Sequence, residues 1–230
     1  MNGSLPPYEV RLEAGLAPAG PTYTAHYPVR LRDGRRLLLP IRPFPDGRRA
    51  IALLMSNQTD FAVEDGLVSQ LAAVAAGFAP QAIVGVPTMG LDYARRVARE
   101  LGFPHYTAMG LSRKFWYDDA LSQPVRSSTS PGQQKSVYLD PALVARIAGK
   151  RVLVVDDVVN TGATLAAVLP LLQRAGADVA GVAAVLTEGH AWRETLGALD
   201  PAWPRRIEAL GHIPMFEAAA GGWKVQAGTE

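Results

Sequence analysis

Several features are missing from this sequence of 230 residues, and each absence narrows its possible functions. It contains no cysteine, which excludes disulfide bonds and thiolate metal sites. It has no apolar run close to the ~20 residues that a membrane-spanning helix needs. Its first fifteen residues lack both a basic start and an apolar stretch, so we expect no signal peptide. We therefore expect a soluble, cytoplasmic protein.

The sequence also has almost no excess of one sign of charge over the other. The formal net charge is +2, and the basic residues are dispersed along the chain although the sequence pI is near 9.0. Such a small net charge gives no reason to expect nucleic-acid binding. Hydrophobic residues make up 48% of the chain and charged residues 19%, so it can bury a full core. Its length suits one domain with additions, since domains usually have about 100–200 residues.

The most informative stretch is 151–175, RVLVVDDVVNTGATLAAVLPLLQRA. Its apolar run VLVV predicts a strand buried on both faces of a parallel sheet. Two adjacent acids, Asp156 and Asp157, stand at the carboxyl end of that strand. The pattern then predicts a loop over 158–164 and a helix that ends at Gly176.

The order of these elements indicates a chemistry. A loop of small and hydroxyl residues that enters a helix offers free backbone N–H groups and the positive end of the helix dipole, which suit a phosphate. The preceding carboxylates can accept hydrogen bonds from sugar hydroxyls or hold a metal ion. A phosphorylated ribose satisfies both halves of the stretch. The structural alternative is a buried strand whose acids only cap a turn.

The thirteen residues VLVVDDVVNTGAT resemble the fingerprint of type I phosphoribosyltransferases, which use phosphoribosyl pyrophosphate (PRPP). The stretch has neither the Gly-Lys-Ser/Thr of nucleoside-triphosphate loops nor the GxGxxG of dinucleotide sites. The resemblance implies that Asp156 and Asp157 hold the ribose hydroxyls, support the developing cation and contact a metal ion carried by PRPP. It also implies a group of residues that bind the 5′-phosphate: Asn160, Thr161, Gly162, Ala163 and Thr164.

The segment before this stretch predicts a βαβ unit. We expect a helix over 60–79 capped by Asp60, a strand over 82–86, a helix over 91–101 and a strand over 105–111. A strand, a glycine-bearing loop, a helix and a strand indicate a parallel, doubly wound sheet. Ligands of such sheets lie beyond the carboxyl ends of the strands.

Two further groups follow strands at the same edge of the predicted sheet. The family places its pyrophosphate-binding loop at the segment formed here by Pro87, Thr88, Met89 and Gly90. Alone, such residues usually only make a turn. Arg113 and Lys114 resemble the basic pair that opens the flexible loop of adenine and xanthine phosphoribosyltransferases, where they would stabilise the leaving pyrophosphate. The alternative is an ordinary solvated basic pair. The polar segment 112–134 is long enough to be a lid.

The base-binding residues give a softer match. The segment at Asn57 and Gln58 is similar to a short base-pocket segment of xanthine phosphoribosyltransferases, and His190 or Trp192 could stack on a purine. Their structural alternatives are turn residues and helix packing. The acid that adenine enzymes carry near the end of the flexible loop has no counterpart at 130–134, which weakens an adenine assignment.

The two ends of the chain predict other kinds of structure than its centre does. At the N-terminal end, residues 1–22 suggest an extended tail, and residues 23–57 suggest a small antiparallel β subdomain with Asp-Gly turns. At the C-terminal end, residues 206–216 suggest a last strand pair, and residues 217–230 suggest a frayed end. We expect three units: 1–57 as a tail and β-hairpin extension, 58–216 as the core with C-terminal hood strands, and 217–230 as a tail.

The resemblance implies an α/β fold with a mainly parallel, doubly wound sheet and a small β-rich hood. It implies transfer of the phosphoribosyl group from PRPP to a nitrogenous base, a purine, with Mg²⁺ bound together with PRPP and a homodimer as the assembly. The alternatives are a PRPP-sensing regulator without catalysis and an enzyme for orotate or another pyrimidine. The strand-like residues 1–60 give no helix-turn-helix pattern, which counts against a DNA-binding regulator.

Overall fold

A parallel sheet forms the centre of the protein. The computed structural model describes residues 7–15, 20–125 and 135–230. In sheet order the five strands are β11 (Ile207–Ile213), β10 (Asp178–Glu188), β9 (Arg151–Val159), β5 (Ala82–Gly85) and β6 (Thr107–Ala108). All four neighbouring pairs are parallel. The expected parallel sheet is therefore confirmed, and it has five strands, although the strand expected over 105–111 is reduced to two residues.

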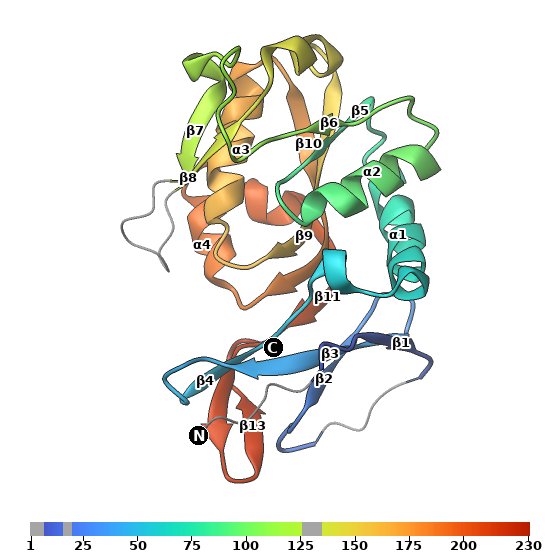
Figure 1. Cartoon of the computed structure of the whole chain (residues 1–230), viewed down its shortest axis with the longest axis vertical. Coiled ribbons are helices and arrows are strands. Elements are labelled where there is room, and N and C mark those ends of the chain that lie inside the picture. The colour runs from blue at the N-terminus through green and yellow to red at the C-terminus, as the bar shows by residue number, and fades with distance from the viewer. Residues whose placement is uncertain (1–6, 16–19, 126–134) are drawn as a thin grey trace.

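Helices cover both faces of this sheet. Helices α1 (Phe61–Ala76) and α2 (Gly90–Glu100) lie on one side, and α3 (Ala163–Arg174) and α4 (Ala191–Gly197) on the other (Figure 1). Short 3-10 helices join these elements: η1 (Ser56–Gln58), η2 (Asp119–Leu121), η3 (Pro141–Arg146) and η4 (Trp203–Arg206). The arrangement confirms the doubly wound α/β fold that the sequence predicted.

The apolar sequence of β9 follows from this layering. Leu153 and Val155 belong to the core on the α1–α2 side, whereas Val152 and Val154 belong to the core on the α3–α4 side. All four side chains are fully buried. A strand covered by helices on both faces has no solvent side and therefore shows a continuous apolar run instead of alternation.

An antiparallel sheet lies below the parallel sheet in Figure 1. It consists of β1 (Arg11–Glu13), β2 (His26–Arg30), β3 (Arg36–Pro43), β4 (Arg49–Ala52), β12 (Phe216–Ala219) and β13 (Gly222–Val225). Its order is β1-β3-β4-β12-β13, with β2 also paired to β3. This confirms the expected β-rich subdomain, and the structure shows that both ends of the chain contribute strands to it.

The chain ends contribute more to this sheet than their composition suggested. Strand β1 lies within the expected N-terminal tail, and the C-terminal segment forms the β12–β13 hairpin instead of fraying. Tyr23 and Trp223 exchange two backbone hydrogen bonds of 2.8 Å, so the two ends support each other. Strand β11 does not pair with β12 as expected, because β11 extends the parallel sheet and β12 pairs with β4. These contacts are remote in sequence.

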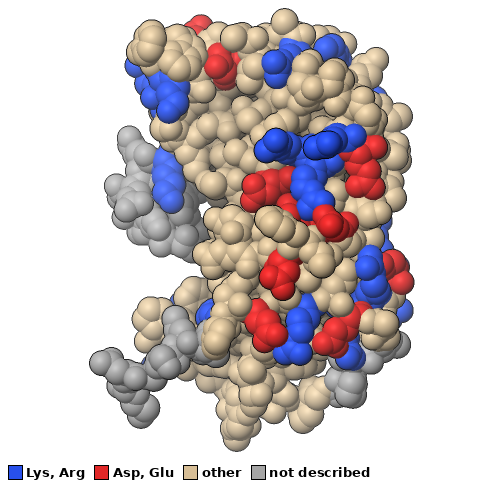
Figure 2. Space-filling view, turned by 45° about the vertical axis from the view of Figure 1, so that its right-hand side comes forward, with Lys and Arg blue, Asp and Glu red and all other residues tan. Residues whose placement is uncertain are grey.

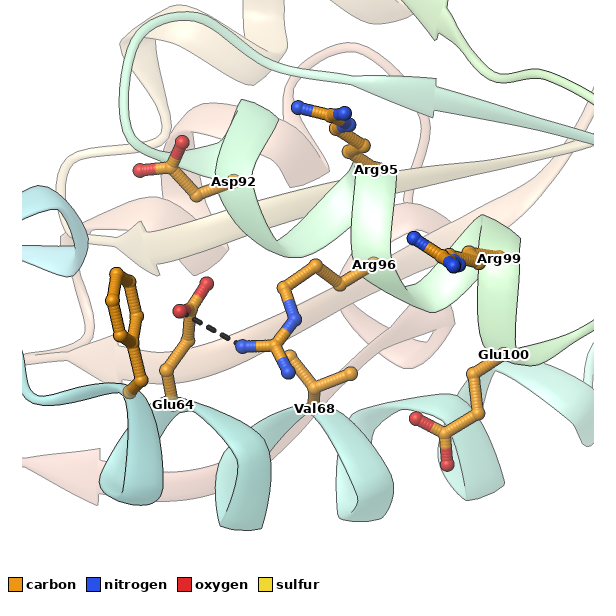
Figure 3. A pocket seen from close by; sticks show the side chains of 8 residues that line it. Glu64, Val68, Asp92, Arg95, Arg96, Arg99 and Glu100 are labelled. Carbon is orange, nitrogen blue, oxygen red and sulfur yellow. Dashed lines mark ion pairs between the residues drawn. The ribbon is translucent and has the colours of Figure 1, made fainter.

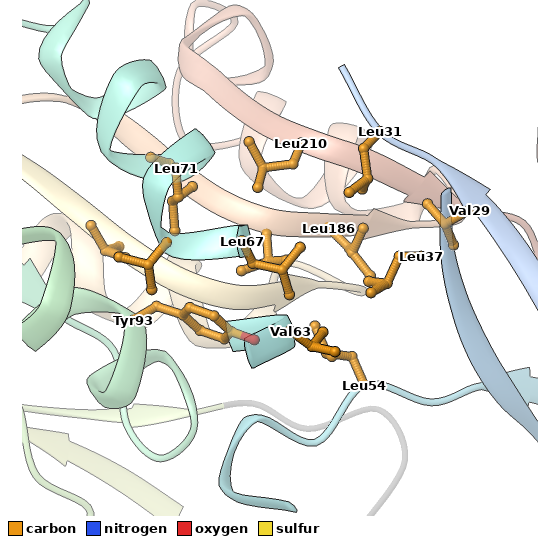
Figure 4. Packing of buried hydrophobic residues seen from close by; sticks show 14 of the residues in the cluster. Val29, Leu31, Leu37, Leu54, Val63, Leu67, Leu71, Tyr93, Leu186 and Leu210 are labelled. Carbon is orange, nitrogen blue, oxygen red and sulfur yellow. The ribbon is translucent and has the colours of Figure 1, made fainter. Parts of the chain in front are cut away.

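The two sheets share one core. Leu37 and Val29 from the antiparallel sheet belong to the same buried cluster as Leu67 and Leu71 of α1 (Figure 4). The start of α1 differs from the expectation: the Asp60 side chain forms no capping hydrogen bond, and the apolar Phe61 at the first helical position is 81% exposed instead of facing the core. The apolar stripe that faces the core begins at Val63.

The segment expected to form one long loop contains regular structure. Strands β7 (Ser122–Val125) and β8 (Lys135–Tyr138) form an antiparallel pair beside α3. Residues 126–134 of the expected lid lie outside the described residues, and the lid function stays a prediction. No helix in the described part of the chain is long and apolar enough to cross a membrane.

Candidate functional site

The carboxyl ends of the neighbouring strands β5 and β9 bring the two predicted phosphate-handling segments to one edge of the sheet. Residues 86–90 follow β5, and residues 160–164 follow β9 and lead into α3. We call this edge the rim. It is the usual location of ligands in doubly wound sheets.

Asp156 and Asp157 lie within β9, which continues to Val159 and so shortens the loop expected over 158–164. Asp156 is 6% exposed, and its Oδ1 accepts a hydrogen bond of 2.9 Å from the backbone N–H of Asp157. Burial raises the pKa of Asp156 well above its usual value, and the neighbouring Asp157 charge raises it further. Burial also raises the pKa of Asp157. These are carboxylates in a dry setting, where electrostatic interactions are strong.

One of the residues expected to bind pyrophosphate, Gly90, lies against Asp156. Gly90, the first residue of α2, lies so close to β9 that a Cβ atom there would be 2.7 Å from Asp156 Oδ1. Any larger residue would force the loop away from the carboxylate. The peptide bond between Pro87 and Thr88 is cis. Residues 87–90 and Asp156 are thus adjacent, as a single ligand spanning ribose and pyrophosphate would require.

Ser56 is a rim residue that the sequence reasoning did not single out. Its Oγ lies 3.1 Å from the carbonyl oxygen of Met89 and 2.9 Å from Asp92 Oδ2, so its proton can be donated to one of them at a time. Ser56 is buried, 4% exposed, and precedes its partners by more than thirty residues. No local pattern could have revealed this support of the 87–90 loop.

The predicted 5′-phosphate segment has the geometry of an anion site. Gly162 has a φ of +76°, a left-handed conformation that favours glycine, and α3 begins at the next residue. Thr161 Oγ1 accepts a hydrogen bond of 3.3 Å from the N–H of Ala163. Thr164 is half-buried in the first turn, and Asn160 is exposed. The first turn of α3 provides the N–H groups and the dipole end that attract phosphate.

Trp192 packs behind this segment. A Cβ on Gly162 would come within 3.3 Å of Trp192 Cβ, and the indole N–H donates a hydrogen bond of 3.1 Å to the carbonyl oxygen of Gly189. The side chain is 4% exposed and belongs to the core on the α3–α4 side. The structure therefore gives Trp192 a packing role in place of the base-stacking role considered from the sequence.

The other residues considered for base binding are more accessible. His190 is half-buried and stacks on His212, with ring centroids 5.0 Å apart and planes inclined by 9°. His212 Nδ1 lies 2.9 Å from Thr187 Oγ1. Asn57 and Gln58 are exposed on η1, beside α2. The role of these residues toward a base stays a prediction.

Arg113 and Lys114 are exposed on the segment between β6 and β7. Arg113 Nε donates a hydrogen bond of 2.9 Å to Asp119, and both side chains are more than half exposed. A solvated ion pair of this kind contributes little to stability, so Arg113 can readily exchange Asp119 for another anion. Their assignment to the leaving pyrophosphate stays a prediction.

Metal binding at the rim would involve few protein ligands. Within residues 7–15, 20–125 and 135–230, no group of three or more histidine, aspartate or glutamate side chains is arranged to hold a metal ion. The two rim carboxylates are oxygen donors of the kind that Mg²⁺ prefers when substrate phosphates supply the remaining ligands. The donor set therefore fits a metal ion held mainly by a phosphorylated ligand.

Comparison with known proteins agrees with this geometry. Residues 59–198 match the model of the phosphoribosyl transferase domain. The chain belongs to this family. The match includes the rim loops and α1 to α4, but not the antiparallel sheet.

Three curated relatives act on different purines by name. The chain is 34% identical over 107 residues to the hypoxanthine/guanine phosphoribosyltransferase of Methanosalsum zhilinae, covering 46% of this chain and 52% of that protein. It is 35% identical over 130 residues to the adenine enzyme of Mycobacteroides abscessus, covering 55% and 68%. It is 30% identical over 169 residues to the xanthine enzyme of Ectopseudomonas mendocina, covering 71% and 83%. The chain thus spans about half the length of the first of these relatives.

A solved structure shows the same fold. The adenine phosphoribosyltransferase of Thermoanaerobacter pseudethanolicus superimposes with a TM-score of 0.57 at 18% identity, over 71% of this chain and 95% of that one. The family and its named purine relatives support phosphoribosyl transfer to a purine, and they do not favour a regulator without catalysis.

Proposed function

We propose that this protein transfers the 5-phosphoribosyl group from PRPP to a nitrogenous base, a purine, and releases pyrophosphate. The observation that carries the proposal is the contact between Gly90 and Asp156, together with the α3 anion site on the same strand. These features bring the residues proposed for pyrophosphate, ribose and 5′-phosphate binding to one edge of the sheet. Family membership supports the same reaction.

The 5′-phosphate fixes the substrate in this mechanism. Backbone N–H groups of 161–164 and the hydroxyls of Thr161 and Thr164 bind its oxygens, and the α3 dipole favours its charge. The glycosyl bond between C1 and the pyrophosphate oxygen then breaks ahead of attack, which leaves positive charge on the ribose. A base nitrogen forms the new bond to C1, the bonding pair of the broken bond leaves with pyrophosphate, and the displaced proton of the base passes to solvent.

Asp156 and Asp157 act on the ribose. Their carboxylates accept hydrogen bonds from the ribose hydroxyls and provide negative charge near the developing cation. Because both acids are largely buried, these interactions operate at low local dielectric. The 87–90 loop, Arg113 and Lys114 bind the leaving pyrophosphate. Closure of 112–134 over the site would exclude water.

Mg²⁺ would enter bound to PRPP and would neutralise the pyrophosphate charge, with Asp156 and Asp157 as its protein-side oxygen donors. The homodimer and the cytoplasmic location are further proposals that rest on the family resemblance. Which purine is the substrate depends on the surroundings of Asn57, Gln58 and His190, and the named relatives use adenine, xanthine and hypoxanthine or guanine.

The double variant Asp156→Asn/Asp157→Asn tests the proposal. We expect it to fold, because the amides keep the carboxylate shape, and to lose more than a hundredfold in pyrophosphate release from Mg²⁺-PRPP and a purine. The matched control is Asp178→Asn/Glu194→Gln, which removes two exposed acids away from the rim and should keep wild-type turnover. Full activity in the rim variant would refute the proposal.

A further inference from the structure

Helix α2 carries three arginines, of which one is neutralised. Arg96 forms an ion pair of 2.8 Å with Glu64 and a second pair with Asp65, both from α1. The three arginines and Glu64 line a cavity of about 700 Å³. In Figure 3 a dashed line marks the ion pair between Arg96 and Glu64, and no dashed line reaches Arg95 or Arg99. Within the described part of the chain, neither of these two has a hydrogen bond or an ion pair.

Arg95 and Arg99 also line a second cavity, of about 470 Å³, beside the C-terminal half of α2. Arg146 and His105 contribute to its walls, and no acidic side chain does so among the residues that the structure describes. The space-filling view shows a cluster of basic side chains on the face turned forward, bordered by acidic side chains (Figure 2). We call this cavity the arginine cavity.

The two arginines without an ion pair among the described residues, Arg95 and Arg99, are exposed on α2. Arg95 and Arg99 are four residues apart on one helix face, where like charges repel each other. The third guanidinium, that of Arg146, is held from η3 by a hydrogen bond of 3.3 Å to the carbonyl oxygen of Tyr106. A fork-shaped guanidinium fixed in this way is suited to phosphate oxygens. A polyanion would remove the repulsion and use all three groups.

The remaining walls are aromatic. Phe103 and Tyr106 both line the arginine cavity and are half-buried against the core, so each ring is held in place by packing. Ordered aromatic rings offer flat surfaces on which a nucleobase can stack. The cavity is also within the usual size of small-molecule sites, about 300–1,000 Å³.

We propose that the arginine cavity binds a nucleoside polyphosphate, with its phosphates on Arg95, Arg99 and Arg146 and its base against Phe103 or Tyr106. This site is separate from the rim, because none of its lining residues belongs to the rim loops. Both sites nevertheless contact α2, which begins at Gly90 beside Asp156 and extends about 16 Å to the cavity. The inference does not depend on the proposed transfer reaction.

Calorimetric titration of the full chain with ATP and with GTP tests this site by stoichiometry. The variant Arg95→Gln/Arg99→Gln should bind one nucleotide fewer per chain than the wild type, or bind it at least tenfold more weakly. This difference is expected whether or not the rim also takes a nucleotide, so a failure of the proposed function stays distinguishable. The same number and affinity of sites in both proteins would overturn the proposal.

Three further measurements sharpen the test. The control Arg48→Gln/Arg205→Gln removes the same charge from two exposed positions outside the cavity and should bind as the wild type does. Inorganic phosphate that binds as tightly as the nucleotides would overturn the nucleoside assignment. Sedimentation velocity checks the competing role as an interface: a changed sedimentation coefficient in Arg95→Gln/Arg99→Gln with unchanged nucleotide binding would also overturn the proposal.

Discussion

The rim and the antiparallel sheet are built in opposite ways. The rim consists of two short continuous segments, 86–92 and 156–164, in which a glycine contacts a buried acid. The antiparallel sheet joins strands from both ends of the chain, with Tyr23 hydrogen-bonded to Trp223 and an aromatic cluster of Tyr23, Tyr27 and Phe216.

The difference separates stability from chemistry. The rim buries Asp156, the neighbouring strand β10 ends at the buried Glu188, and buried carboxyl groups without charged partners lower stability. The antiparallel sheet buries apolar and aromatic side chains, which raises stability. Substitutions in the sheet should therefore change the free energy of unfolding, and those at the rim should mainly change PRPP binding and turnover.

The largest expected effect on stability concerns Phe216. It is 1% exposed and packs edge-on against Tyr27 at 5.0 Å between ring centroids. Phe216→Ala should lower the free energy of unfolding by about 3–5 kcal/mol in urea denaturation. PRPP affinity of the folded protein should not change. The matched control is Phe61→Ala, at a side chain that is 81% exposed, with an expected loss below about 0.5 kcal/mol. Equal losses in the two variants would contradict this account of the sheet.

Glu188, the last residue of β10, should reveal the cost of a buried acid. Burial raises its pKa to about 7 from the ordinary 4.5. Because the folded state holds this proton more tightly, the contribution of Glu188 to stability is highest below pH 4.5 and falls by about 3 kcal/mol in total as the pH rises through 7. Glu188→Gln should remove this decline in denaturation measured between pH 5 and pH 8. A variant with the same slope as the wild type would show that Glu188 is not responsible, and exposed Glu194→Gln serves as control.

A substitution at Gly162 should change both stability and PRPP affinity, and a matched glycine elsewhere should change stability alone. Gly162→Ala places a Cβ at a φ of +76° and 3.2 Å from Trp192 Cα, which should cost about 1–2 kcal/mol of stability and weaken PRPP binding more than tenfold. Gly34→Ala shares a left-handed φ, +83°, but its Cβ meets no atom within 4 Å. It should lose a similar stability without losing affinity. Unchanged PRPP affinity in Gly162→Ala would contradict the 5′-phosphate site proposed for residues 160–164.

Ser56 should give the smallest effect. Ser56→Ala leaves the Met89 carbonyl and Asp92 without its hydroxyl and should cost about 1 kcal/mol in thermal or urea unfolding. It should also raise the KM for PRPP while kcat changes less, because the 87–90 loop loses support. Ser122→Ala, whose hydroxyl bonds an exposed backbone oxygen at Asp119, provides the comparison. An unchanged KM in Ser56→Ala would show that η1 does not position the loop.

The same contrast explains what the sequence could predict. The run VLVVDD and the loop that follows it are contiguous, so their strand, acids and anion site could be expected together. Pairing of Tyr23 with Trp223, the position of β11 in the parallel sheet and the Ser56 contact join residues that are far apart, and no local period reveals them. Trp192 is a third case, because the sequence does not distinguish an aromatic residue that packs in the core from one that stacks on a ligand.

The most direct test of the central claim is pyrophosphate release from Mg²⁺-PRPP, measured separately with adenine, guanine, hypoxanthine, xanthine and orotate. We expect turnover with at least one purine and none with orotate, since the rim is the proposed PRPP site and the named relatives are purine enzymes by name. Turnover with orotate alone would contradict the purine assignment. No release with any base would contradict the enzymatic claim, and calorimetric binding of PRPP in that case would point to a PRPP-sensing protein.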